Sequence, residues 1–157
     1  MARIEVSTHS EAPPTRVWQV LVDWESQPRW MVDARSVTVL TPTRAGTGVV
    51  LRCETDILAG LVVTDDMVVT EWRPPRSLAV RHLGRLIRGV GAFELEPAAE
   101  GTHITWWEEV EAPFGGVGDA VAQVLVLPRT RRLFQASLAN LARVAEARTA
   151  APRGKAR

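Results

Sequence analysis

The stretch LIRGVGAFELEPAAEGTHITWWEEVE, residues 86–111, decides the fold of this chain. Apolar and polar side chains alternate on both sides of its centre, which is the period of a β-strand with one buried face. Residues 97–101 in the centre hold a proline and a glycine, and so short a turn joins antiparallel neighbours. The stretch therefore predicts an antiparallel hairpin with Phe93 and Trp106 on its buried face.

The same alternation recurs along the chain before this hairpin. In all, the predicted strands cover residues 2–9, 36–40, 47–57, 61–72, 77–83, 86–96 and 102–111. From the second strand onward the connections are short and contain glycine or proline, which favours antiparallel pairing of successive strands. We expect a seven-stranded antiparallel sheet.

Helical periodicity appears outside the strands. Residues 14–22 and 23–31 predict two short helices between the first and second strands, and Pro28 breaks the second of them. Residues 117–148 predict one amphipathic helix, roughly 45 Å long, with a kink at Pro128. A curved sheet can bury its concave face against such a helix, so the predicted fold class is α+β.

Length and charge narrow the possible classes of protein. A chain of 157 residues suits one domain, which we predict over residues 1–148, followed by a disordered basic tail over residues 149–157. Nineteen basic and eighteen acidic residues give a net charge of +1, whereas nucleic-acid-binding proteins usually carry a strong basic excess. Nucleic acid is therefore not an expected partner.

Targeting and membrane signals are weak. Residues 1–8 lack the apolar run of a signal peptide, and no stretch approaches the roughly 20 apolar residues of a membrane span. The single cysteine, Cys53, has no partner for an internal disulfide and is expected to be inert core. We expect a cytoplasmic protein without integral membrane association.

Four segments carry a resemblance to a known family. They are residues 14–30 (PTRVWQVLVDWESQPRW), 69–78 (VTEWRPPRSL), 93–106 (FELEPAAEGTHITW) and 140–146 (NLARVAE). Their motifs, in this order and spacing, resemble the START-like (SRPBCC) superfamily, and within it the bacterial polyketide cyclase/dehydrase-like branch. The resemblance implies a helix-grip fold, in which a seven-stranded antiparallel sheet wraps around the C-terminal helix with an apolar cavity between them. Members of that superfamily include lipid carriers, hormone receptors and aromatase/cyclases. The resemblance therefore implies a protein whose function depends on a ligand in this cavity.

Strand alternation predicts which side chains line such a cavity. The predicted apolar wall consists of Leu51, Met67, Val80, Phe93 and Trp106. Three polar side chains fall on the same inward faces: Asp65, His82 and Glu108. We expect His82 and Glu108 to contact a bound ligand together with the wall residues.

The three inward polar residues are also candidate catalytic residues. A histidine near a carboxylate in a dry cavity can act as a general acid or base. An aldol-type cyclase or dehydratase needs such groups to deprotonate a carbon beside a carbonyl and to protonate a leaving hydroxyl. Two other roles stay open for Asp65, His82 and Glu108, namely polar anchors for a ligand and structural groups near the cavity mouth.

The sequence contains no motif for metal binding, for phosphate binding or for a serine nucleophile. The histidines and the single cysteine show no metal-ligand spacing, and no phosphate-binding loop or Gly-x-Ser-x-Gly elbow occurs. The sequence therefore predicts no metal and no cofactor. The glycine-rich residues 113–118 are expected to form a lip that gates the cavity.

The favoured prediction is a protein that binds a hydrophobic small molecule, such as a lipid, a polyketide or another aromatic or isoprenoid-like ligand. An enzyme of polyketide cyclase/dehydratase type is the alternative. A third possibility is a protein-interaction module that uses the sheet edge or the arginine-rich helix surface. That surface carries Arg129, Arg131, Arg132 and Arg143. No oligomeric state follows from the sequence.

Overall fold

The computed structural model describes residues 2–58, 60–111 and 127–150. All seven predicted strands are present: β1 (Ala2–Ser10), β2 (Ala34–Val39), β3 (Val50–Leu58), β4 (Leu61–Arg73), β5 (Ser77–His82), β6 (Gly89–Pro97) and β7 (Thr102–Val110). They form one antiparallel sheet in the order β1-β7-β6-β5-β4-β3-β2. Only β1 leaves the sequential order, because it pairs with β7 at the edge.

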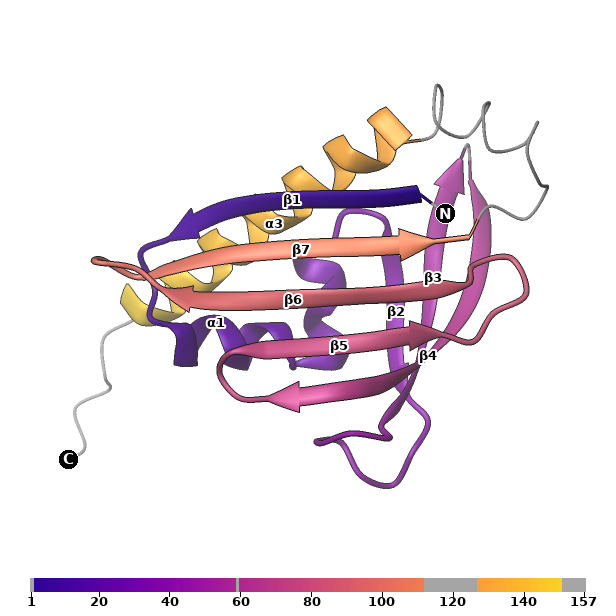
Figure 1. Ribbon diagram of the computed structural model, residues 1–157, viewed down its shortest axis with the longest axis horizontal. Helices are drawn as coiled ribbons and strands as arrows, with labels where there is room; N and C mark the ends of the chain where they lie inside the picture. The colour runs from indigo at the N-terminus through magenta and orange to yellow at the C-terminus, as the bar shows by residue number, and fades with distance from the viewer. Residues whose placement is uncertain (1, 59, 112–126, 151–157) are drawn as a thin grey trace.

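The helices gather on one face of this sheet (Figure 1). They are α1 (Pro14–Leu21), the 3₁₀ helix η1 (Trp24–Arg29) and α3 (Leu127–Ala150). The long helix α3 packs on β1 and against α1, while η1 packs on β2. This is the helix-grip α+β fold that the sequence predicts.

Several predicted strand boundaries shift by one to three residues. The strand predicted over residues 86–96 begins at Gly89, and residues 83–88 form a loop instead. Gly89 has a φ of 138°, and a Cβ atom there would lie 1.9 Å from the backbone oxygen of Glu109. Only glycine tolerates both conditions, so pairing with β7 starts at this residue.

The long helix also differs from its predicted bounds. Pro128 is the second residue of α3 in the part of the chain that the structure describes, and the turn before it, where the predicted kink would be seen, lies outside the described residues. The predicted start of this helix at residue 117 and the predicted lip over residues 113–118 lie outside the described residues. Helical structure continues to Ala150, and the rest of the predicted tail lies outside the described residues as well.

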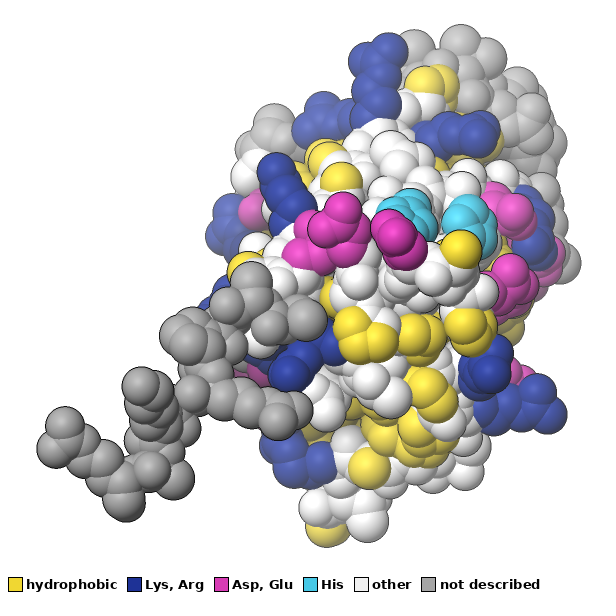
Figure 2. Space-filling model, turned by 90° about the vertical axis from the view of Figure 1, so that its left-hand side faces the viewer, with side chains coloured by type: hydrophobic (Ala, Val, Ile, Leu, Met, Phe, Trp, Pro, Cys, Tyr) yellow, Lys and Arg dark blue, Asp and Glu magenta, His cyan; other side chains and the backbone are white. Residues whose placement is uncertain are grey.

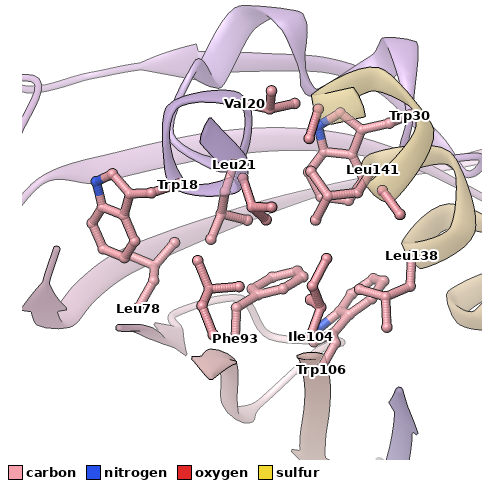
Figure 3. Packing of buried hydrophobic residues seen from close by; sticks show 14 of the residues in the cluster. Trp18, Val20, Leu21, Trp30, Leu78, Phe93, Ile104, Trp106, Leu138 and Leu141 are labelled. Carbon is pink, nitrogen blue, oxygen red and sulfur yellow. The ribbon is translucent and has the colours of Figure 1, made fainter. Parts of the chain in front are cut away.

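Four aromatic rings in mutual contact, which we call the aromatic stack, lie in the interior: Phe93, Trp106 and Phe134 are stacked, and Trp30 meets Phe93 edge to face. The ring centroids of Phe93 and Trp106 are 4.9 Å apart, and those of Trp106 and Phe134 are 3.8 Å apart. Leu138 and Leu141 of α3 pack around these rings (Figure 3). The stack therefore joins the end of η1, the centre of the sheet and α3 through buried apolar contacts.

Candidate functional site

The three polar residues predicted to face inward meet at one end of the sheet. Asp65 comes from β4, His82 ends β5, and Glu108 lies near the end of β7. His82 Nδ1–H donates to Asp65 Oδ2 at 2.5 Å, and His82 Nε2 lies 3.8 Å from Glu108 Oε2. We call these three residues the polar cluster, in which the imidazole stands between two carboxyl groups.

Glycines on β6 allow the polar cluster to form. The strands of His82 and Glu108 are not neighbours, because β6 runs between them. The residues of β6 opposite these two side chains are Gly89 and Gly91. A Cβ atom at Gly91 would lie 2.9 Å from Glu108 Cγ. Glycine at this position therefore leaves room for the Glu108 side chain to reach across the sheet.

All three members of the polar cluster are withdrawn from solvent. Their side chains are 4% exposed for Asp65, 6% for His82 and 16% for Glu108. Asp65 Oδ1 and His82 Nε2 are buried and have no hydrogen-bond partner within the described part of the chain. An unpaired buried polar atom destabilises a fold by about 1–3 kcal/mol, so such atoms in a native protein call for an explanation.

Burial and mutual charge shift the acid–base properties of the polar cluster. Burial raises the pKa of Glu108 to about 7, even though the attraction of His82 opposes the shift. For His82, burial acts to lower the pKa, but the hydrogen bond to Asp65 and the charges of both carboxylates outweigh it. The pKa of His82 therefore lies above its ordinary value. Near neutral pH the Glu108 carboxyl group is populated in both protonation states.

A further carboxylate, Asp33, belongs to the same neighbourhood and was not predicted. It lies in the turn before β2, where burial raises its pKa and the charge of Asp56 adds to the shift. Its own charge raises the pKa of Glu108 and that of the buried thiol of Cys53. No periodicity marks the direction of a turn residue, so only the folded chain brings Asp33 to this interior.

The five predicted wall residues divide into two groups. All five belong to one hydrophobic cluster or pack against it. Met67 lies opposite His82 in the β4–β5 register, and Val80 precedes His82 by two residues on the same face. Phe93 and Trp106 instead form part of the aromatic stack, and Leu51 is fully buried on β3. Met67 and Val80 thus border the polar cluster, and so does Trp106, whose side chain also donates a hydrogen bond to Glu108.

The other two histidines lie far from the polar cluster. His9 and His103 pair in register on β1 and β7, at the opposite end of the sheet from His82, and both are exposed. Figure 2 views that end, where two histidine side chains lie on the surface close to acidic ones. In the part of the chain that the structure describes, no group of three His, Cys, Asp or Glu side chains is arranged to hold a metal ion.

Fold and site together define a helix-grip protein with a buried acid–base cluster at one end of its sheet. A family model supports this class: the model described as polyketide cyclase / dehydrase and lipid transport matches residues 1–146. The chain belongs to this family, which confirms the START-like relationship predicted from its motifs. A comparison with curated protein sequences gave no match.

Solved structures share the fold. A protein from Thermus thermophilus superposes with a TM-score of 0.81 at 18% identity, over 95% of this chain and 100% of that one. The Zhui aromatase/cyclase from a Streptomyces species gives 0.73 at 23% identity, over 98% of each chain. A START superfamily protein from Mycobacterium smegmatis gives 0.64 at 17% identity, over 93% of this chain and 95% of that one. Within the described residues, no helix combines the length and apolar character needed to cross a bilayer.

Proposed function

We propose that this protein binds a mainly apolar small molecule that carries a carbonyl or hydroxyl group. Its apolar body contacts Met67 and Val80 in the interior between sheet and helix, and its oxygen atom is held by His82 and Glu108. A lipid, a polyketide or another aromatic or isoprenoid-like compound has this chemistry. The observation that carries the proposal is the pair of buried atoms, Asp65 Oδ1 and His82 Nε2, without a hydrogen-bond partner in the described chain.

A structural role and a binding role of the polar cluster make different demands on its buried polar atoms. A purely structural cluster stabilises a fold best when every buried donor and acceptor is paired. The imidazole of His82 is paired on its Asp65 side but not on the side that faces Glu108, at 3.8 Å. A ligand hydroxyl in that position would donate a hydrogen bond to neutral His82 Nε2, and a ligand carbonyl or hydroxyl oxygen would accept one from protonated Glu108. Binding would thus supply the hydrogen bond that His82 Nε2 lacks in the described part of the free protein.

Binding is tested first with two probes of different shape. We expect 1,8-dihydroxyanthraquinone or oleic acid to quench the tryptophan fluorescence of the protein, because Trp106 lies near the polar cluster. His82→Ala and Glu108→Gln should weaken binding of the preferred probe about tenfold. His103→Ala and Glu100→Gln are matched controls at exposed positions at the other end of the sheet and should bind as the native chain does. Equal affinities for all five proteins would overturn the assignment of the anchor.

A second function, cofactor-free acid–base catalysis, is favoured by the position of His82 between two carboxyl groups. Neutral His82 Nε2 would take a proton from the carbon beside a substrate carbonyl, while Asp65 stabilises the imidazolium through Nδ1–H. Neutral Glu108 would give its proton to the departing β-hydroxyl, so that water leaves and a carbon–carbon double bond forms. Proton transfer from His82 to Glu108 then restores both groups.

Catalysis has a direct assay. An aryl β-hydroxyketone such as 4-hydroxy-4-(1-naphthyl)butan-2-one becomes a conjugated enone on dehydration, which is followed by absorbance. The native chain should accelerate the reaction over buffer, and His82→Ala or Glu108→Gln should lower the rate at least about 100-fold. A native rate equal to that of buffer, despite binding of the ketone, would leave binding as the function and overturn catalysis.

A further inference from the structure

A second hollow lies directly beside the polar cluster. The loop of residues 83–88 and the adjoining ends of β5, β6 and β7 enclose a groove of about 540 Å³. Three arginines line it, Arg81, Arg85 and Arg88, and all three are exposed. We call this hollow the arginine groove.

The charges in the arginine groove are not balanced by the protein itself. On this face Asp66 pairs with Arg52 at 2.8 Å and Glu109 pairs with Arg3 at 2.8 Å. By contrast, no described carboxylate forms an ion pair with any of the three groove arginines. Because Glu109 is already neutralised by its partner, Glu111 is the remaining acidic side chain of the lining. The groove therefore carries a net positive charge that is available to a ligand.

The arginine groove and the polar cluster adjoin each other at His82. His82 belongs to both, since it lines the groove and bonds Asp65. Gly84 also lines the groove, and a Cβ atom there would lie 2.6 Å from Asp65 Oδ1. The carboxyl group of Asp65 thus lies directly beside a residue that lines the groove.

We propose that the arginine groove binds an anionic group, a phosphate or a carboxylate, of the ligand whose oxygen is held at His82. This inference rests on the proposed function and makes its ligand an anionic amphiphile. The guanidinium groups of Arg81, Arg85 and Arg88 present planar sets of donors that match the oxygens of either anion. The apolar side chains of Leu83 and Leu86 on the same loop are 51% and 57% exposed and suit the first carbons of the ligand chain.

A matched pair of probes tests the proposal. Decyl phosphate and decan-1-ol share their apolar chain and differ in the anionic group, and each is titrated against tryptophan fluorescence below its aggregation limit. The native chain should bind decyl phosphate about tenfold more tightly than decan-1-ol. The triple substitution R81Q/R85Q/R88Q should reduce this ratio to about one and leave the affinity for decan-1-ol unchanged.

A charge-matched control separates the groove from the overall charge. R129Q/R131Q/R132Q removes three exposed arginines from α3 and should keep the native ratio. The removal of a negative charge by E111Q should raise the ratio about twofold. An equal loss of the ratio in both triple variants, or no loss in the groove variant, would overturn the proposal.

Two further measurements distinguish a free anion from a lipid headgroup. They also distinguish failure of the anion site from failure of the proposed function. Weak binding of inorganic phosphate that R81Q/R85Q/R88Q abolishes would support the groove as an anion site by itself. Groove-dependent binding to vesicles of phosphatidylcholine and phosphatidylglycerol, without discrimination between the decyl probes, would overturn it in favour of a membrane contact. Failure of decan-1-ol and both larger probes to bind would overturn the proposed function, whereas binding of both decyl probes with equal affinity overturns only the anion site.

Discussion

The aromatic stack and the polar cluster are both buried on the same face of the sheet, yet they are held together by different kinds of contact. Each ring of the stack lies against another ring, and Trp106 contacts one on either side. In the polar cluster two buried atoms lack a partner in the described chain, and Glu108 has a pKa of about 7. The rings of the stack stabilise the fold through apolar contact, and Trp30 Nε1 is the one atom of the stack that is buried without a hydrogen-bond partner among the described residues. Both unpaired atoms of the cluster, by contrast, belong to titratable side chains and lower the stability of the fold.

The largest expected effect comes from breaking the stack. Trp106→Ala removes the ring between Phe93 and Phe134 and should lower the free energy of unfolding by about 3–5 kcal/mol. Urea denaturation measures this loss. Trp107→Ala is the matched control, because its ring faces outward beneath the guanidinium of Arg3 and should cost about 1 kcal/mol. Equal losses for the two variants would show that the stack is not the stabilising region.

The second prediction concerns the sign of the pH dependence. Because the folded pKa of Glu108 is about 7 and its ordinary value is 4.5, the folded state binds the proton more tightly. Its contribution to stability is complete below pH 4.5 and is lost as the pH rises through 7. We expect the free energy of unfolding to fall by about 2–3 kcal/mol between pH 5 and pH 8.

Glu108→Gln sharpens this prediction because glutamine has nearly the same shape and no proton to lose. The variant should keep most of its pH 5 stability at pH 8, as measured by urea denaturation across this range. The substitution also removes the charge of Glu108 that helps to raise the pKa of His82, so it should reduce the contribution of His82 to the decline as well. Glu109→Gln on the outer face should decline as the native chain does, and an equally steep decline in Glu108→Gln would contradict the assignment.

The sequence predicted much of the site because strand alternation is a local property. Periods of two placed Asp65, His82 and Glu108 on inward faces, and the structure has all three side chains withdrawn from solvent. Their mutual contact depends on strand order and register, which link residues on three different strands and are not encoded in any one of them. The Glu108 side chain can reach across β6 because Gly91 has no side chain at that position. The alternating pattern of a strand does not reveal this role, because a glycine adds no side chain to either face.

The residues that prediction missed occupy turns and loops. Asp33 precedes β2 in a turn, where neither a period of two nor a period of 3.6 orients its side chain. Residue 83 and residues 86–88 were predicted as parts of two strands with only residues 84 and 85 between them, so the full loop that carries Arg85 and Arg88 was not anticipated. The fold was predictable because the apolar pattern of a strand recurs in seven segments and that of a helix extends over one long segment. The arginine groove depends on one loop and on the single position of Gly89.

The smallest expected effect tests whether space at Gly91 links the sheet to the polar cluster. A Cβ atom at this position would lie 2.9 Å from Glu108 Cγ, so Gly91→Ala must displace that side chain. The net loss of stability should be about 1 kcal/mol, because alanine in a strand also reduces the entropy of the unfolded chain. In a Glu108→Ala background the same substitution should cost nothing, since the added methyl group then fills vacated space. Urea denaturation of the four proteins gives the coupling between the two positions, and additive effects would mean that Gly91 is not what makes room for the polar cluster.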